Sequence, residues 1–438
     1  AAVLAYLRNG YALALFVLTA ASWGATSPQA SQGSVGLFLT EEERERLIAD
    51  LDSLSGPAAA SYRNLMSRAN AALSKKADPF RMEDVTQIRF GWCEKPAGED
   101  DTLKELSDKL DKQSDTIRSL ALAFSLSGKI EYAEKAEEML LDWVEQSTLL
   151  NLYDLEIDFR KARMIGSTDD GYCGDRPWNM ALDTMWQAYG LINMSDAYLL
   201  LKGGGHAFSS EARTRIEAWI RELAEAVNSS FHAWTRWADA HPNSRGFTRY
   251  RSDNHLGWSL AGLMAAAVAL DDDELANYVL RGGEWEDSKA GVYANPSSIR
   301  ALIDLAIESG TGADNEGRIY EEKIRRKPPV GYAFFHLWAM TLVAEMAETR
   351  YGEDLWNYEG SDGGSLKSAF LRYADFILGT RESPKPEQES SRAAHSWLYE
   401  IASTKWDDAV FKQARDRGKR DKHMRQSIGP VTLIYGRE

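Results

Sequence analysis

The stretch "SDNHLGW" (residues 252–258) brings together two side chains that can stabilise negative charge, the amide of Asn254 and the imidazole of His255. They stand directly before a long apolar run, "LGWSLAGLMAAAVAL", which predicts a buried helix. Asp253 or Asn254 is a good N-cap, so His255 begins this helix. Helix N-termini attract anions through free N–H groups and the helix dipole. The pair therefore either caps the helix or is held at its open end to contact a ligand.

A second segment, "NEGRIYEEKIRRKPPVGYAFFHL" (residues 315–337), contains Glu322, then Arg325 three residues later, and Tyr332 seven residues after the arginine. Glu322 is spaced to form an ion pair that orients Arg325. The Pro-Pro pair interrupts any continuous helix and predicts a new one whose first turn contains Tyr332. A helix N-terminus and a nearby arginine favour an ionised phenol, which can exchange protons near neutral pH. His336, one turn further along, is predicted to be structural.

Three long loops, at 89–101, 159–179 and 234–255, are rich in polar, aromatic and basic residues. The third contains four arginines within 236–251 against a single aspartate, which makes a local positive patch in an acidic protein. Long polar loops on a helical scaffold commonly carry function, and flat aromatic rings can stack on sugar faces. The candidate substrate-binding residues are Arg176, Trp178, Asn179, Trp237, His241, Arg249 and Arg251.

The elements that must position these residues are helical from Leu39 onward. Thr40 and Glu43 form a capping-box pattern at the start of the first helix. A unit of a small-residue helix, a short turn and a second amphipathic helix occurs at 119–143, 260–280 and 334–358, and in looser form at 178–201. Repeated helix pairs with long loops predict an all-α fold, a single α/α toroid over 34–438 with its loops gathered over one end. Strand signals are weak, and "GPVTLIYG" (429–436) is the best candidate.

The composition limits the class of protein. The chain has 438 residues, 44% of them hydrophobic, which allows a sizeable core. The formal net charge of −15 argues against nucleic acid as the main partner. No apolar run in the body of the chain is long enough to span a bilayer. An oxidising compartment would allow Cys93 and Cys173 to pair, although spacing alone does not decide it, and no Cys/His cluster has the spacing of a zinc site.

The N-terminal segment reads as a targeting signal. Arg8 precedes the apolar stretch "YALALFVLTAASWGA", and small and polar residues follow it. This order predicts a signal peptide and flexible spacer over residues 1–33. We therefore expect a secreted or periplasmic protein with no stable membrane insertion after cleavage.

The order of the chemical residues resembles the alginate lyase family of polysaccharide lyases. The shared pattern is an Asn-His pair before an Ala-rich helix, then G-x-x-x-x-E-x-x-R and a tyrosine seven residues after the arginine; the matching residues are Asn254, His255, Gly317, Glu322, Arg325 and Tyr332. The likeness covers most of 40–350 patchily and includes the helix pair at 119–143, while "KPPVG" before the tyrosine departs from the usual run. It implies an α/α toroid and β-elimination on a uronate polymer without an obligatory cofactor or metal. By resemblance, Tyr332 transfers the proton, Asn254 and Arg325 offset the charge of the substrate carboxylate, and His255 assists.

The stereochemistry of the uronate narrows the expected substrate. In β-D-mannuronate and β-D-glucuronate, the C5 hydrogen and the O4 substituent lie on the same side of the ring. One tyrosine can then take the proton from C5 and deliver it to O4. In α-L-guluronate the two lie on opposite sides, so a second group such as a neutral His255 is needed. The predicted partner is therefore an anionic polysaccharide, mannuronate-rich alginate or polyglucuronate.

Two other functions fit parts of the same sequence. A glycoside hydrolase on a similar toroid would use paired carboxylates, and one loop supplies Asp169, Asp170 and Asp175. A non-catalytic uronan-binding protein would carry the same aromatic and basic loops. A lyase leaves a conjugated double bond that absorbs ultraviolet light, whereas hydrolysis and binding do not.

Overall fold

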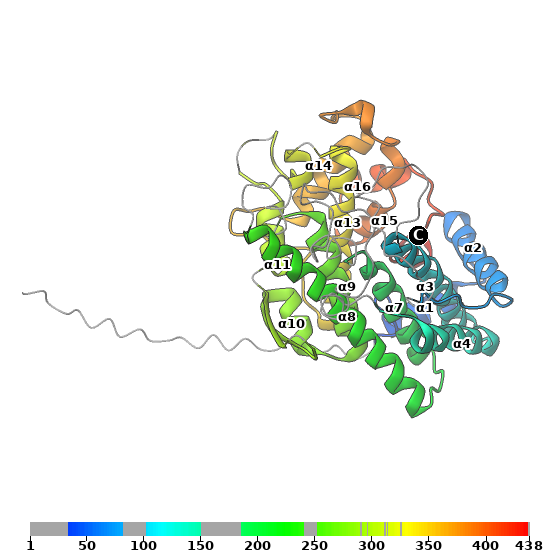
Figure 1. Ribbon diagram of the computed structural model, residues 1–438. Helices are drawn as coiled ribbons and strands as arrows, with labels where there is room; N and C mark the ends of the chain where they lie inside the picture. The colour runs from blue at the N-terminus through cyan, green and yellow to red at the C-terminus, as the bar shows by residue number, and fades with distance from the viewer. Residues whose placement is uncertain are drawn as a thin grey trace, which may run out of the picture.

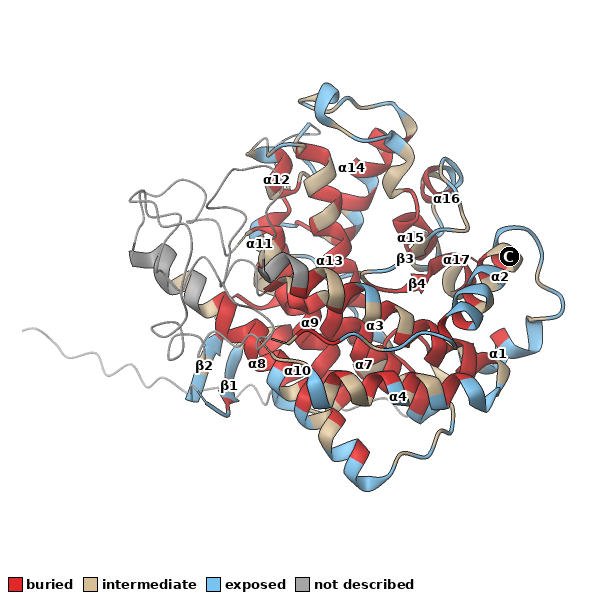
Figure 2. Ribbon diagram, turned by 45° about the vertical axis from the view of Figure 1, so that its right-hand side comes forward, coloured by how far each residue is buried: buried red, intermediate tan, exposed pale blue. Residues whose placement is uncertain are grey.

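The structure is a computed structural model. It describes residues 34–81, 102–149, 185–240, 252–289, 291–295, 297–310, 312, 314–324 and 326–436. Helices make up most of this described part. Four long helices form the inside of the fold (Figure 1): α3 (Thr102–Ser127), α7 (Ala188–Gly203), α9 (Asn254–Leu270) and α13 (Pro329–Tyr351). α7 packs against α3 and α9, and α9 packs against α13. Because α9 and α13 are apolar on nearly every side, they are buried among other helices (Figure 2).

The inner helices run parallel, so their N-termini gather at one end of the fold. A Cβ at Gly257, near the start of α9, would lie 3.1 Å from His336 Cδ2, near the start of α13. At the far ends of the same two helices, Arg350 pairs with Asp271. Contacts between α3 and α7 follow the same order from N-terminus to C-terminus. The two segments that carry the predicted chemistry therefore lie at the same end.

A second set of helices covers the inner ones. These are α4 (Ile130–Gln146), α8 (Ser210–Ala240), α10 (Asp273–Arg281) and α14 (Leu366–Leu378). Each follows an inner helix in the chain and packs on it, α4 on α3, α8 on α7, α10 on α9 and α14 on α13. This order of inner and outer helices is the ring of helix hairpins that the sequence predicts.

Of the four predicted helix pairs, two are confirmed, one is wrong and one is only partly described. The pair at 119–143 spans the turn between α3 and α4, and the pair at 260–280 spans the turn between α9 and α10. The unit at 334–358 is instead the single helix α13 followed by a loop, because Gly352 adopts φ 64° and ends the helix. The described part of 178–201 is a 3-10 turn that leads into α7 alone.

Smaller elements complete the described chain. The remaining described helices are α1 (Glu41–Asp50), α2 (Gly56–Ala72), η2 (Met185–Gln187), α11 (Ile299–Ala306), α12 (Tyr320–Lys323), η3 (Pro386–Gln388), η4 (Arg392–His395), α15 (Leu398–Lys405), α16 (Ala409–Asp416) and α17 (Val431–Tyr435). The strands form two antiparallel pairs, β1 (Gly283–Asp287) with β2 (Gly291–Asn295) and β3 (His423–Met424) with β4 (Gly429–Pro430). The capping box of Thr40 and Glu43 is confirmed at the start of α1.

The predicted strand at 429–436 is wrong for most of its length. Only its first two residues pair as a strand, and the β-branched run after them forms the helix α17, which packs against α2. Burial of Val431 and Leu433 in that contact outweighs their strand propensity. The hairpin of β1 and β2, where Trp285 lies opposite Tyr293, was not predicted.

One buried apolar cluster runs from Val35 to Leu433 and joins the described elements into a common core. The expectation that no apolar run in the body is long enough to span a bilayer is wrong for α13. By length and composition, this helix could cross a membrane. Since 83% of its most apolar window is buried inside the protein, its apolar surface is used to form the core.

Candidate active site

The start of α9 holds His255 in a defined orientation. Asp253 is the N-cap of the helix, and its Oδ1 accepts a 3.0 Å hydrogen bond from the His255 backbone N–H. Its Oδ2 lies 3.0 Å from His255 Nδ1. Because an ionised carboxylate only accepts hydrogen bonds, Nδ1 carries a hydrogen and donates the hydrogen bond to Asp253. The carboxylate therefore fixes the tautomer and the orientation of the imidazole.

Asn254 is held by a carboxylate of a different element. Glu321 Oε1, on α12, accepts hydrogen bonds from the Asn254 backbone N–H at 2.7 Å and from its Nδ2 at 2.9 Å. Glu321 Oε2 lies 2.9 Å from Nδ1 of His336 on α13. All three residues are buried, so this network ties α9, α12 and α13 together beside the site. His336, predicted to be structural, takes part in it through Glu321.

Tyr332 lies in the first turn of α13, as the Pro-Pro pair predicts. The helix begins at Pro329 with Pro328 as N-cap, and the Tyr332 N–H donates to the Pro328 carbonyl at 3.1 Å. The Tyr332 side chain is half-buried. Burial raises the pKa of Tyr189 on α7, and Tyr332 lies close enough to raise it further.

Arg326 connects the tyrosine to the Asn-His segment. Its guanidinium lies 4.2 Å from the centroid of the Tyr332 ring, and its Nη1 lies 3.8 Å from Asp253 Oδ2. Burial alone would raise the pKa of Asp253, but the bond to His255 and the charge of Arg326 hold it below its ordinary value. Asp253 is thus a carboxylate at neutral pH, shared between His255 and Arg326. The sequence reasoning missed Arg326 and Glu321, although each directly adjoins a residue of the recognised pattern.

Both helix N-termini are already occupied by carboxylates of the protein itself. Asp253 and Glu321 accept the first N–H groups of α9. At α13, Glu389 accepts the backbone N–H of Val330 and of Gly331, each at 2.8 Å. The expectation that free N–H groups at these ends attract an anion is therefore wrong for the groups that these carboxylates bind. Of the side chains at the two helix ends, those of His255 and Tyr332 are partly exposed and can contact a ligand.

Glu322 is bound by two residues of α14, while Arg325, its predicted partner, lies outside the described part of the chain. Arg372, on α14, donates to both oxygens of Glu322, at 2.9 and 2.5 Å, and Tyr373 donates its hydroxyl to the same carboxylate at 2.8 Å. Glu322 therefore joins α12 to α14. The recognised pattern also includes Gly317, whose φ of 70° and close approach to the Ser368 carbonyl exclude a side chain.

Several predicted residues lie outside the described part of the chain. They are Arg325, Arg176, Trp178, Asn179, His241, Arg249, Arg251, Cys93, Cys173, Asp169, Asp170, Asp175 and the whole of 1–33, together with the side chain of Trp237 on α8. The predicted loop at 234–255 is wrong at both ends, because 234–240 belong to α8 and 254–255 to α9. The predicted loops at 89–101 and 159–179 precede the inner helices α3 and α7 in the chain. Among the described residues, no group of three or more His, Cys, Asp or Glu side chains is arranged to hold a metal ion.

Comparison with solved structures identifies the fold. An alginate lyase from Bacteroides ovatus is 17% identical, with a TM-score of 0.58, and the match covers 92% of this chain and 99% of that one. A tyrosine-to-phenylalanine variant of alginate lyase A1-III complexed with tetrasaccharide is 16% identical, with a TM-score of 0.58 and coverage of 93% and 97%. Alginate lyase A1-III from Sphingomonas species A1 is 16% identical, with a TM-score of 0.53 and coverage of 92% and 95%. The predicted α/α toroid is confirmed.

Comparison of the sequence with known families and proteins gives the family. No curated protein matches the chain. The family described as "Alginate lyase" matches residues 55–383, more than half of the chain. The chain therefore belongs to the alginate lyase family, a family of polysaccharide lyases.

Proposed function

We propose that this protein cleaves mannuronate-rich alginate or polyglucuronate by β-elimination, with Tyr332 as the proton-transferring residue. The observation that carries the proposal is the contact of Arg326 with both halves of the site. One guanidinium lies against the Tyr332 ring and beside the Asp253 carboxylate that orients His255. The phenol of Tyr332 and the oriented imidazole of His255 are thus linked through Arg326 and Asp253, which supports their acting as a base and a charge-stabilising group on one substrate.

The proposed reaction needs no group beyond these side chains and the substrate. The ionised phenol of Tyr332 takes the C5 proton, and the electron pair of the broken C–H bond moves onto the C5 carboxylate. Donors on Asn254, His255 and Arg325 stabilise the charge that develops there. The charge then returns to form the C4–C5 double bond as the C4–O4 bond breaks. The Tyr332 phenol gives its proton to the departing O4, so the residue ends the cycle ionised.

The polymer preference follows from using one residue as both base and acid. Tyr332 can serve both steps only when the C5 hydrogen and O4 lie on the same side of the ring, as in mannuronate and glucuronate. The hydrogen bond from His255 Nδ1 to Asp253 fixes the orientation of the imidazole, which supports a charge-stabilising role for His255. We therefore propose weak activity on polyguluronate. The solved alginate lyase A1-III complexes contain a tetrasaccharide, which supports an oligosaccharide cleft on this fold.

An ultraviolet assay of the purified protein against polymannuronate, polyglucuronate and polyguluronate tests the proposal. Tyr332→Phe should lower kcat by about 10² to 10⁴ while binding and folding persist, since the change deletes one hydroxyl. Tyr62→Phe, on the remote helix α2, is the matched control and should keep full activity. New reducing ends without ultraviolet absorbance would indicate a hydrolase. Binding without any product would indicate a uronan-binding protein, and half-maximal activity in Tyr332→Phe would remove the tyrosine from the mechanism.

We also propose that the protein is exported. The proposal rests on Arg8 and the apolar stretch that follows it, which have the order of a signal peptide. Mass spectrometry of secreted or periplasmic material should find a new N-terminus between about Ser22 and Gly33, as cleavage after small residues predicts. Recovery of the chain with Ala1 intact from the cytosol would contradict export.

A further inference from the structure

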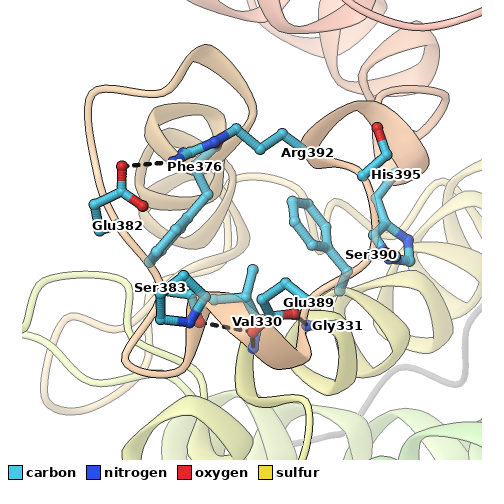
Figure 3. A pocket seen from close by; sticks show the side chains of 12 residues that line it. Val330, Gly331, Phe376, Glu382, Ser383, Glu389, Ser390, Arg392 and His395 are labelled. Atoms are coloured by element: carbon cyan, nitrogen blue, oxygen red, sulfur yellow. Dashed lines mark hydrogen bonds and ion pairs between the residues drawn. The ribbon is translucent and has the colours of Figure 1, made fainter.

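A pocket of about 310 Å³ lies beside the first turn of the tyrosine helix (Figure 3). Phe334 of α13 and Phe376 of α14 form two of its walls, and His395 stacks on Phe334 with ring centroids 4.6 Å apart. Glu389 lies at its floor. One oxygen of that carboxylate accepts the Val330 N–H and the Ser383 hydroxyl, at 2.8 and 2.7 Å, and the other accepts the Gly331 N–H at 2.8 Å.

The contact fixes the part of α13 that carries Tyr332. Val330 and Gly331 are the second and third helical residues, whose N–H groups have no partner within a helix, and Tyr332 is the next residue. A carboxylate at this end satisfies two of these groups and opposes the positive end of the helix dipole. The approach is close, since a Cβ at Gly331 would lie 2.9 Å from Pro328 Cγ and 3.4 Å from Glu389 Oε2. The backbone just before Tyr332 is therefore held by the two bonds to Glu389 and by the close approach of Pro328.

The pocket and the reacting groups lie on different faces of the helix. At about 100° per residue, Val330, Gly331 and Phe334 share one face, and Tyr332 projects away from it toward Arg326. Glu389 thus reaches the tyrosine only through the backbone. Its loop is anchored independently, because Arg392 pairs with Glu382 at 2.6 Å and donates to the Phe376 carbonyl at 3.0 Å.

We infer that Glu389 is a positioning residue for catalysis: its carboxylate locks the first turn of α13 so that Tyr332 meets the substrate in a reactive orientation. The inference rests on the proposed function of Tyr332 as the proton-transferring residue. It predicts that removal of the carboxylate lowers turnover more than substrate binding. It also predicts that an added small carboxylate, entering through the pocket, restores the lost contact.

Glu389→Ala, Glu389→Gln and the matched control Glu387→Ala test this. Glu387 is exposed in the same loop, within η3, and does not line the pocket. In Glu389→Ala we expect kcat to fall between about tenfold and a hundredfold, as displacement of a catalytic group does, with KM nearly unchanged. Glu389→Gln, which keeps one acceptor oxygen, should fall between the wild type and Glu389→Ala. Glu387→Ala should match the wild type.

Chemical rescue separates positioning from a general loss of structure. Acetate has the shape of the group that Glu389→Ala removes, so sodium acetate should raise kcat of this variant and raise its midpoint of thermal unfolding. Acetamide, which has one acceptor oxygen, should restore less than acetate does. Sodium chloride at the same ionic strength should do neither, and acetate should leave the wild type unchanged. Restoration by acetate would also show that the variant is folded around an empty carboxylate site.

Two results would overturn the inference. One is full kcat in Glu389→Ala, and the other is a loss of kcat in both Glu389 variants that acetate does not reverse. A wild-type protein that is inactive on all three polymers would instead refute the proposed function. In that case the acetate-dependent rise in the unfolding midpoint of Glu389→Ala would still report whether the carboxylate site at α13 exists.

Discussion

Replacing Asp253 by asparagine should reverse the tautomer of His255 while leaving the helix cap in place. Asparagine is as good an N-cap as aspartate, so its Oδ1 can keep the bond to the His255 backbone N–H. Its Nδ2 takes the place of Oδ2 and can only donate. His255 Nδ1 must then accept that bond, and the proton moves to Nε2. The substitution thus converts His255 into a fixed donor toward the cleft.

The structure sets the size of the two effects. The variant exchanges one charge-assisted hydrogen bond, 3.0 Å long, for a neutral one and removes the carboxylate 3.8 Å from Arg326. We expect a stability loss of about 1–2 kcal/mol, the usual difference between such bonds. Where an imidazole acts as the base, a wrong tautomer costs about 10⁴ in kcat. Where His255 only stabilises charge, Nε2–H persists, and kcat should fall about tenfold, which corresponds to the net contribution of about one hydrogen bond.

Initial rates of ultraviolet-absorbing product on polymannuronate and polyguluronate measure both cases in one variant. With Tyr332 as the base, Asp253→Asn should lose about tenfold on polymannuronate, whereas any activity on polyguluronate, which would need His255 as the base, should fall by up to about 10⁴. Urea unfolding of the same preparation checks that the fold persists. A loss of 10³ or more on polymannuronate would refute the reasoning and make His255 the base there too, on the same scale.

Three further predictions concern stability. Arg372→Met should destabilise the protein by about 3–5 kcal/mol in urea unfolding, because it leaves the buried Glu322 carboxylate without its charged partner. Glu322→Gln in the same chain should recover part of this loss, and no recovery would argue against the pair. Burial raises the pKa of Asp196 to about 6, so the stability associated with its protonated form is complete below about pH 4 and is lost as pH rises through 6. Asp196→Asn should therefore be more stable than the wild type by about 2–3 kcal/mol at pH 8 and equal to it near pH 4, and a pH-independent difference would contradict this. Gly317→Ala should cost at least about 1–3 kcal/mol from the positive φ alone, with more from the clash with the Ser368 carbonyl, and an unchanged unfolding midpoint would show that the backbone can relax there.

Much of the fold follows from local sequence. Helical periodicity, the capping box at Thr40 and the nearly uniform apolarity of α9 and α13 are properties of short windows, and they predict the inner helices and the ring that buries them. The same windows fail where packing decides. The β-branched run after Pro430 is typical of a strand, but it forms a helix that packs against α2.

The sequence by itself determined which side chains stand at the two helix starts. N-cap preference places Asn254 and His255 at the beginning of α9, and proline stereochemistry places Tyr332 in the first turn of α13, because both are constraints on a few neighbouring backbone angles. Only the tertiary structure decided which charges meet there. Of the adjacent glutamates Glu321 and Glu322, either could face the site, and the choice depends on how α12 packs. Arg326 contacts the tyrosine, Glu321 binds Asn254, Glu322 binds Arg372, and Glu389 reaches α13 from a distant loop. These contacts form between segments that packing, rather than sequence spacing, brings together.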